Sequence, residues 1–276
     1  MSVPLLCVVT GGGSGLGRAI SLALARAGHR VVLLCRDPQR GEQARAELAA
    51  VTGNPAVELV VGDLSVRAAT RAAARVLRER HARIDVLVHN AGIWPTRLER
   101  TEDGLERSFA INHLAPFILN AALEDRLGRG SRVVQVTAGL AVKGQVDLAR
   151  TPVGGDFHRF RTYANTKLCN LLHTGELARR WADRGVTVNA VHPGVVRTKL
   201  GDMSGPLGLL LRLIKRRWLP PEVGAQGPVR LACDPALADV SGRYFDQLAE
   251  APWPAPALDQ ALARALWERS VEYAER

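Results

Sequence analysis

The most constraining feature of the sequence is a short apolar run that leads directly into a glycine-rich turn. The run covers residues 5–9, and the turn reads Thr10-Gly11-Gly12-Gly13-Ser14-Gly15-Leu16-Gly17. Apolar residues then recur at helical spacing from Ile20 to Ala27, until Gly28 stops the pattern. Backbone without Cβ atoms can approach a pyrophosphate closely, and the amides that open a helix receive its charge. The segment therefore predicts a strand, a phosphate-binding loop and a helix.

A Walker-type loop is the main alternative for this turn. Gly12 and Gly17 have the required spacing, but Arg18 and Ala19 stand where a lysine and a magnesium-binding hydroxyl are needed. The glycines at 11, 15 and 17 fit Gly-x-x-x-Gly-x-Gly instead. This spacing favours a dinucleotide.

Apolar runs and amphipathic helices alternate along the rest of the chain. Runs without polar alternation are typical of strands buried on both faces. The expected strands are residues 5–9, 31–35, 57–61, 84–89, 132–136, 186–191 and 242–245. Seven strands alternating with helices predict an α/β fold, a doubly wound parallel sheet with helices on both faces. We expect a single domain over residues 1–276.

Two stretches, residues 141–161 and 199–221, interrupt the alternation. Ligands of doubly wound folds bind outside the carboxyl ends of the strands, where long loops cover them. The second stretch is therefore a predicted lid. Its apolar run from Leu207 to Leu213, with Trp218, favours a fairly apolar substrate. The alternative is that this run packs on its own domain or on a neighbouring subunit.

Composition narrows the class of partner and compartment. Lys and Arg outnumber Asp and Glu by 37 to 27, but the surplus is scattered apart from the triplet at 215–217, and no nucleic-acid motif accompanies it. We expect no nucleic-acid partner. No apolar run approaches the roughly 18 residues of a spanning helix, and no signal peptide is evident, so no stable membrane insertion is expected. The separated cysteines predict no metal site and a reducing, cytoplasmic location; they are Cys7, Cys35, Cys169 and Cys233.

Tyr163 and Lys167 stand four residues apart in what reads as the first turns of a long helix. This spacing places both side chains on one helical face. A free phenol has a pKa of about 10, and an ammonium group one turn away lowers that value. Such a pair can pass a proton at neutral pH. The same spacing also occurs where a tyrosine merely packs over a lysine stem.

The end of the second expected strand bears on which dinucleotide binds. An acid at this place bonds the ribose hydroxyls of NAD, but here Cys35 is followed by Arg36. A neutral residue removes repulsion of a 2′-phosphate, and an arginine forms charge-assisted bonds to it. We therefore predict NADP. The alternative is NAD with Asp37 as the ribose acid.

Six motifs in order make the chain resemble the short-chain dehydrogenase/reductase family, nearest to its retinol-dehydrogenase-like branch, which has a Rossmann fold. They are Thr10 to Gly17, Asp63-Leu64, Asn90-Ala91-Gly92, Asn112 to Phe117, Tyr163 to Lys167, and His192-Pro193-Gly194 running to Thr198. The resemblance implies that Tyr163 is a general acid/base, that Lys167 lowers its pKa and holds the nicotinamide ribose, and that Asn112 anchors a water in a proton relay. It also implies a homo-oligomer, either a dimer or a tetramer.

The resemblance further implies which residues contact the cofactor. Asp63 would lie at the adenine, and Pro193, Gly194 and Thr198 along the nicotinamide amide. The full expected set is Gly11, Ser14, Gly15, Leu16, Gly17, Arg36, Asp63, Leu64, Asn90, Ala91, Gly92, Tyr163, Lys167, Pro193, Gly194, Val196 and Thr198.

One position departs from the family pattern. The family places a catalytic serine just after the fifth strand, and alignment on Val136 and Gly144 puts Ala138 there. Loss of one donor to a developing oxyanion costs typically about 10² to 10³ in rate if nothing replaces it. Thr137 is one candidate replacement, although a shift of one residue normally sends a side chain to the opposite face.

A different polar residue near the predicted mouth could also replace the serine. The candidates are His89, Trp94, Lys143 and His158. Alternatively, the fold serves a step without redox chemistry: a cyclisation, elimination or isomerisation. Our first prediction is an NADP-dependent oxidoreductase that interconverts a carbonyl and an alcohol on a fairly apolar small molecule. The repurposed, non-redox enzyme is the alternative.

Overall fold

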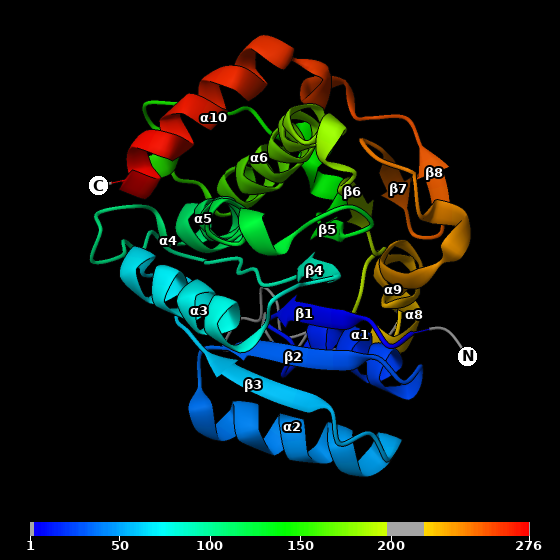
Figure 1. Cartoon of the computed structure of the whole chain (residues 1–276). Coiled ribbons are helices and arrows are strands. Elements are labelled where there is room, and N and C mark those ends of the chain that lie inside the picture. Colours follow the sequence, from blue (N-terminus) through cyan, green and yellow to red (C-terminus); the bar gives the residue numbers. More distant parts are fainter. Residues whose placement is uncertain (1–2, 198–217, 276) are drawn as a thin grey trace.

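The computed structural model describes residues 3–197 and 218–275. An eight-stranded sheet forms the centre of the molecule in the order β3-β2-β1-β4-β5-β6-β7-β8 (Figure 1). Its strands are β1 Leu6–Thr10, β2 Arg30–Cys35, β3 Val57–Val61, β4 Val86–His89, β5 Arg132–Val136, β6 Thr187–His192, β7 Tyr244–Asp246 and β8 Ala249–Ala251. The first seven are parallel, and β8 runs antiparallel to β7. The predicted doubly wound α/β fold is thus confirmed.

The strand count differs from the prediction. The seven expected strands lie within two residues of their predicted bounds, but an eighth, β8, closes the edge of the sheet. Its sequence, Ala249-Glu250-Ala251, has no apolar run, because an edge strand with exposed residues needs none.

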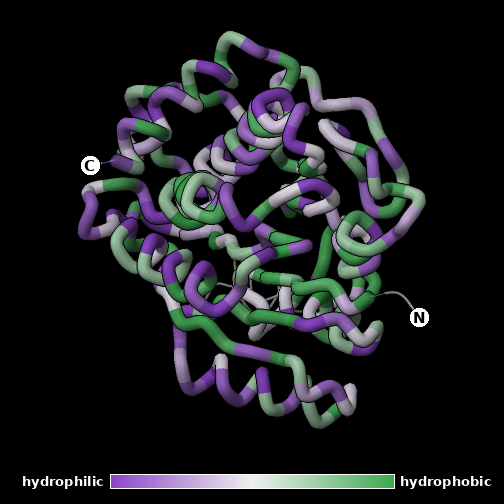
Figure 2. The backbone as a smooth tube through the Cα atoms, in the orientation of Figure 1, coloured by the Kyte–Doolittle hydropathy of each residue, from purple (hydrophilic) through white to green (hydrophobic). Residues whose placement is uncertain are grey.

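Helices cover both faces of the sheet. They are α1 Gly15–Arg26, α2 Pro38–Thr52, α3 Arg67–Arg80, α4 Arg107–Phe109, α5 Ala115–Ala122, α6 Arg159–Arg180, α8 Pro221–Gly224, α9 Gln226–Cys233 and α10 Gln260–Glu275. One core packs α1, α2 and α9 against the sheet, and a second packs α3, α5 and α6 against the other face. Figure 2 shows apolar strands inside a shell of mixed helices.

Successive residues of β1 point to opposite faces of the sheet, and both faces are buried, so the strand sequence is apolar throughout. Cys7 and Val9 belong to the first core, whereas Leu6 and Val8 belong to the second. Since both faces are covered, every position of the strand is buried.

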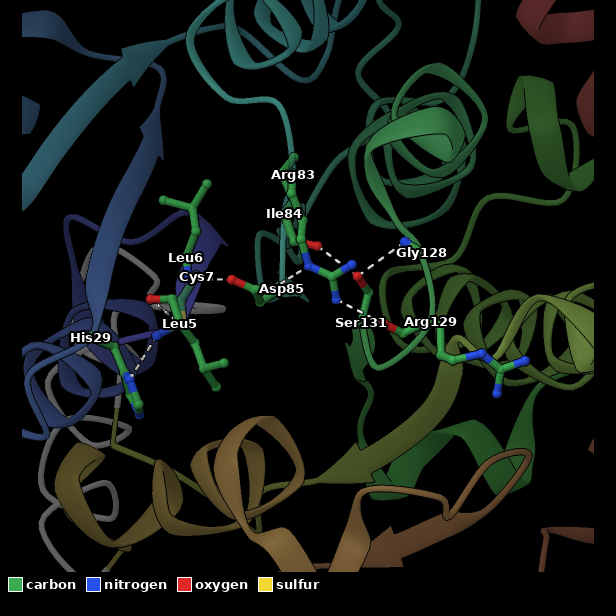
Figure 3. A network of polar contacts seen from close by, with 10 residues as sticks. All are labelled: Leu5, Leu6, Cys7, His29, Arg83, Ile84, Asp85, Gly128, Arg129 and Ser131. Atoms are coloured by element: carbon green, nitrogen blue, oxygen red, sulfur yellow. Dashed lines mark hydrogen bonds and ion pairs between the residues drawn. The ribbon is translucent and has the colours of Figure 1, made fainter. Parts of the chain in front are cut away.

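A polar network fixes the amino ends of the central strands (Figure 3). The carboxylate of Asp85 accepts from the backbone N–H of Leu6 at 2.8 Å and from Nε of Arg83 at 2.6 Å. Arg83 also donates to the carbonyl of Arg129 at 2.8 Å. The network anchors the start of β1 to the segments before β4 and β5. The motifs singled out in the sequence lie at the opposite, carboxyl edge of the sheet.

Candidate active site

The glycine loop between β1 and α1 has the geometry that a pyrophosphate requires. Gly11 and Gly15 adopt positive φ angles of 65° and 51°. A Cβ at Gly17 would lie 2.2 Å from the carbonyl oxygen of Gly11, so only glycine fits there. The Ser14 side chain makes no capping bond to α1, and the first turn carries no acid. Its amides are therefore available to an anion, and the loop, with Leu16 in that first turn, fits a dinucleotide phosphate.

Thr10 ties the glycine loop to the end of β4, a role that the sequence did not predict. Its hydroxyl accepts from the backbone N–H groups of Asn90 and Ala91 at 3.0 and 2.9 Å. The side-chain amide of Asn90 donates back to the carbonyl of Thr10 at 3.0 Å. The strand order reverses between β1 and β4, so these bonds fix the crevice where doubly wound folds bind ligands.

Arg36 and Asp37, which follow β2, differ in what their side chains contact. Oδ1 of Asp37 accepts from the backbone N–H groups of Gln39 and Arg40, both at 3.0 Å, and so caps α2. The side chain of Arg36 is exposed. Cys35 is buried, and burial raises the pKa of its thiol. The acid that could have bonded a ribose is thus engaged with a helix, and the arginine is accessible.

Asp63 and Leu64 follow β3 on the same edge. Oδ1 of Asp63 accepts from the backbone N–H and the hydroxyl of Ser65 at 2.8 and 2.7 Å, which closes a local turn. Leu64 is buried in the second core. The pair lies just beyond β3, the strand that pairs with β2, and so on the side of the crevice where the adenine contact is expected.

Tyr163 and Lys167 lie in the first three turns of α6 and are both buried. Nζ of Lys167 donates to the carbonyl of Val136 at 3.2 Å and lies 5.8 Å from the centroid of the Tyr163 ring. Burial lowers the pKa of Lys167 to about 8 and raises the pKa of Tyr163 above its ordinary value. The lowered phenol pKa expected from the spacing is not found in this structure, because desolvation of the buried phenol raises its pKa.

Asn112 reaches the same place from a π-helical segment, Ala110–Leu114, between α4 and α5. Its side chain accepts from the N–H of Ile93 at 2.8 Å, and it donates to the carbonyl of Ile93 and to the hydroxyl of Thr166, each at 3.0 Å. A Cβ at Gly92 would lie 3.3 Å from Oδ1 of Asn112 and 3.5 Å from Nζ of Lys167. Widened helical turns of this kind are frequent at functional sites. The structure therefore brings the three predicted residues Gly92, Asn112 and Lys167 together.

Ala138 follows β5 in an extended conformation and offers only a methyl group. The hydroxyl of the preceding residue, Thr137, is buried and donates to the backbone carbonyl of Lys167 at 3.1 Å. The N–H of Gly139 donates to Nδ1 of His192 at 3.2 Å, so His192 supports this turn from the end of β6.

The four further candidates for the missing donor are placed differently from one another. His89 is buried, and its Nε2 shares a 2.8 Å hydrogen bond with Asn120. The indole N–H of Trp94 donates to the carbonyl of Arg159 at 2.7 Å. Lys143 and His158 are exposed.

Trp94 also lies flat on Tyr163, with ring centroids 4.5 Å apart and planes inclined by 9°. The two residues are far apart in sequence, and the spacing of motifs gives no signal of this contact.

Pro193, Gly194 and Val196 extend from β6 along the carboxyl edge. Gly194 has a φ of 82°, and a Cβ there would lie 2.6 Å from the side chain of Leu219. Val196 forms a parallel bridge with Leu219, which returns the chain to this edge before α8. Thr198 and residues 199–217 of the predicted lid lie outside the described residues.

Comparison with known proteins decides the family. Residues 6–205 match the short chain dehydrogenase family. The chain belongs to this family. It is 38% identical to retinol dehydrogenase 14 of Mus musculus, over 95% of this chain and 84% of that protein. It is 39% identical to dehydrogenase/reductase SDR family member 13 of Bos taurus, over 97% of this chain and 72% of that protein.

A solved structure agrees with this assignment. A short chain dehydrogenase from Burkholderia cenocepacia in complex with NADP is 26% identical, with a TM-score of 0.71, over 88% of this chain and 95% of that chain. As a short-chain dehydrogenase of the retinol-dehydrogenase-like branch, the protein is an oxidoreductase of small molecules that uses a nicotinamide cofactor.

Neither a metal cluster nor a membrane-spanning helix is found in the described part of the chain. Among residues 3–197 and 218–275, no three His, Cys, Asp or Glu side chains are grouped to hold a metal ion. None of the helices described there combines the length and the apolar character needed to cross a membrane.

Proposed function

We propose that this short-chain dehydrogenase uses NADP to interconvert a carbonyl and an alcohol on a fairly apolar small molecule, with Tyr163 as the general acid/base. The observation that carries the proposal is the convergence of Lys167 and Asn112 on Gly92 at the carboxyl edge of the sheet, with the Tyr163 ring centroid 5.8 Å from Nζ of Lys167. A purely binding protein needs no such buried pair of proton-transferring side chains.

The proposed division of labour follows from the contacts of each residue. NADP, when bound, supplies or accepts the hydride. In reduction, the Tyr163 hydroxyl gives a proton to the substrate oxygen; in oxidation, the phenolate takes it back. Lys167, held by the carbonyl of Val136, places its positive charge near the phenol and favours the phenolate. Asn112, which is hydrogen-bonded to Ile93 and Thr166, anchors a water in the proton relay that leads from Tyr163.

Support for NADP over NAD comes from the end of β2. Asp37 engages its carboxylate with two backbone amides of α2, whereas Arg36 is exposed next to it. A guanidinium forms strong bonds to a 2′-phosphate, and the carboxylate of Asp37, which could bond a ribose hydroxyl instead, is engaged with the backbone of α2. The remaining cofactor contacts proposed are those of the glycine loop, of Asp63 and Leu64, of Asn90 and Ala91, and of the 193–198 segment.

The alternative function is a non-redox step on the same fold, a cyclisation, elimination or isomerisation. Ala138 is the observation that favours it, because the usual hydroxyl partner of the tyrosine is missing. Such a reaction still uses Tyr163 as acid or base, but it neither consumes nor produces reduced cofactor.

One experiment separates the two functions. The protein is titrated with NADPH and NADH, and the absorbance of the reduced nicotinamide is followed with a panel of aldehydes, ketones and quinones. The first proposal expects tighter binding of NADPH and its oxidation by at least one carbonyl. It also expects Y163F to abolish turnover while NADPH affinity stays nearly unchanged. Binding without oxidation by any carbonyl would support the non-redox alternative.

The cytoplasmic location and the dimer or tetramer stay predictions. Size-exclusion chromatography with light scattering tests the second, and fractionation of the host cells tests the first.

A further inference from the structure

The indole of Trp94 covers one face of the Tyr163 ring. The centroids lie 4.5 Å apart and the planes are within 9° of parallel, so the contact is a full stack rather than an edge. Trp94 comes from the segment after β4, directly behind the Asn90-Ala91-Gly92 motif, whereas Tyr163 belongs to α6. The contact therefore joins two segments that both border the proposed cofactor site.

A hydrogen bond fixes the indole in this position. Its Nε1–H donates to the carbonyl of Arg159 at 2.7 Å. Arg159 opens α6, four residues before Tyr163, so the bond and the stack attach Trp94 to the same face of one helical turn. Phe160 adds an edge contact to the indole, with centroids 5.4 Å apart and planes inclined by 74°. The indole plane is thus held at its N–H edge and at its side.

This arrangement restricts the phenol in two ways. A ring stacked at this distance cannot rotate about its Cβ–Cγ bond without displacing the indole. The stack also shields the ring from solvent, and Tyr163 is 4% exposed. A phenol in such surroundings has a raised pKa and keeps its proton to higher pH, because desolvation penalises the phenolate.

We propose that Trp94 is a positioning residue of this enzyme, which holds the plane of the Tyr163 phenol and keeps water from it. The inference rests on the proposed role of Tyr163 as the general acid/base. Trp94 itself has no free donor for the substrate, since its N–H is bound to Arg159. It acts on the reaction only through the orientation and the ionisation of the tyrosine.

The first test is the pH dependence of carbonyl reduction. Reduction needs a protonated Tyr163, so activity falls as pH rises through the pKa of the phenol in the complex. W94A admits water to the ring and lowers that pKa. The basic limb of the pH–activity profile, where activity falls as pH rises, is therefore expected to move to lower pH by about one unit or more. The value of kcat is expected to fall at least about tenfold, while KM for NADPH stays within about twofold.

Two further variants separate positioning from general damage. W94F keeps a ring but loses the bond to Arg159, and we expect a smaller shift of the basic limb in the same direction. Trp253 is the matched control, because its indole N–H also donates to a backbone carbonyl, that of Gly242 at 3.1 Å. W253F should leave the basic limb unmoved. Equal shifts in W94F and W253F, or no shift in W94A, would overturn the proposal.

The second test needs no cofactor and no turnover. The chain has three tyrosines, so Y244F/Y273F leaves Tyr163 as the only phenol, and its ionisation can be followed by tyrosinate absorbance. In that background W94A is expected to ionise at least about one pH unit below its parent, with circular dichroism confirming folded protein at each pH. If W94A does not fold, W94F is read in the same way.

The two tests keep the inference separate from the proposed function. If no carbonyl is reduced but W94A lowers the pH at which Tyr163 ionises, the oxidoreductase proposal fails and the role of Trp94 stands. If reduction occurs but the ionisation and the pH profile are both unchanged in folded W94A and W94F, the role of Trp94 is wrong.

Discussion

The hydroxyl of Thr137 donates a 3.1 Å hydrogen bond to the backbone carbonyl of Lys167. This bond joins the end of β5 to α6 at the residue that carries the site's ammonium group. It also commits the only hydrogen of the Thr137 hydroxyl to the protein interior. The geometry favours a structural role for Thr137, at the position next to the missing serine.

Replacement of Thr137 by valine tests that assignment. T137V removes one neutral hydrogen bond and keeps the volume, so we expect a loss of about 1 kcal/mol in the free energy of unfolding, measured with urea. We expect T137S to retain it. Turnover should change by less than about threefold in T137V, whereas a residue that donates to the oxyanion would cost about 10² to 10³. A loss of that size in T137V at unchanged stability would restore Thr137 as the catalytic donor.

Ala138 gives the complementary prediction. If the protein reduces carbonyls without a serine, A138S should add the missing donor and raise kcat by up to about 10²-fold. A138G serves as the control, since it changes the side chain without adding a hydroxyl. The comparison is made with a single aldehyde or ketone at saturating NADPH. An A138S variant that is folded and no faster than the parent would mean that another group already supplies the donor.

Much of the fold was predictable because buried parallel strands and a glycine loop have recognisable sequence patterns. The runs at β1 and β2 are apolar throughout since helices cover both faces, and Gly17 is required by contact with Gly11. The edge strand β8 has exposed residues and no such pattern.

The proximity of the candidate site residues was predictable, but their environment was not. The spacing of Tyr163 and Lys167 predicts that they are neighbours, and they are. It carries no information on burial, which reverses the expected shift of the phenol pKa. Nor could the spacing predict the stack of Trp94 on Tyr163, which depends on the path of the loop after β4 over a helix far along the chain.

Arg36 is expected to favour binding of NADPH, whereas Asp37 would favour NADH if it bonded the ribose. R36A should weaken NADPH binding by about 10- to 100-fold, the worth of a charge-assisted contact, and leave NADH affinity unchanged. D37N is the matched variant, because asparagine also caps a helix and α2 should remain intact. If Asp37 bonded the ribose of NAD, D37N would weaken NADH binding selectively. Both affinities are measured by quenching of tryptophan fluorescence.

Lys167 should make stability depend on pH in the alkaline range. Its pKa is lowered by burial to about 8, against an ordinary value of 10.5. Between these values the unfolded chain binds a proton that the folded protein does not, so this contribution to stability rises with pH. At neutral pH the buried charge of Lys167 lowers the free energy of unfolding by on the order of 3 kcal/mol.

The variant K167M removes that cost, and K143M, at an exposed lysine, is the control. The difference in unfolding free energy between wild type and K167M should therefore narrow as pH rises from about 8 to 10. The difference for K143M should stay constant. A constant difference for K167M would mean that the ammonium is not desolvated in the folded protein.

A buried histidine cluster between β4, α5, α6 and α10 should make the protein sensitive to acid. His89 and His173 both share hydrogen bonds with Asn120, at 2.8 and 3.1 Å, and His113 shares one with Ser270 at 2.8 Å. Burial lowers all three pKa values, that of His89 to about 4, that of His113 to about 3 and that of His173 well below its ordinary range. The folded protein thus keeps three neutral imidazoles.

Below a pH of about 6.5 the unfolded chain protonates these histidines and the folded protein does not, so their contribution to stability decreases as the pH is lowered towards about 4. Three protons correspond to a slope of about 4 kcal/mol per pH unit. H89Q keeps a polar partner for Asn120 and should reduce the slope by about 1.4 kcal/mol per pH unit, the contribution of one proton, whereas H158Q, at an exposed residue, should not. Urea unfolding at intervals from about pH 7 to 5 measures the slope. Equal slopes of unfolding free energy against pH for wild type and H89Q would show that His89 is charged in the folded state. The histidine cluster would then need an acidic partner, which the described residues do not offer.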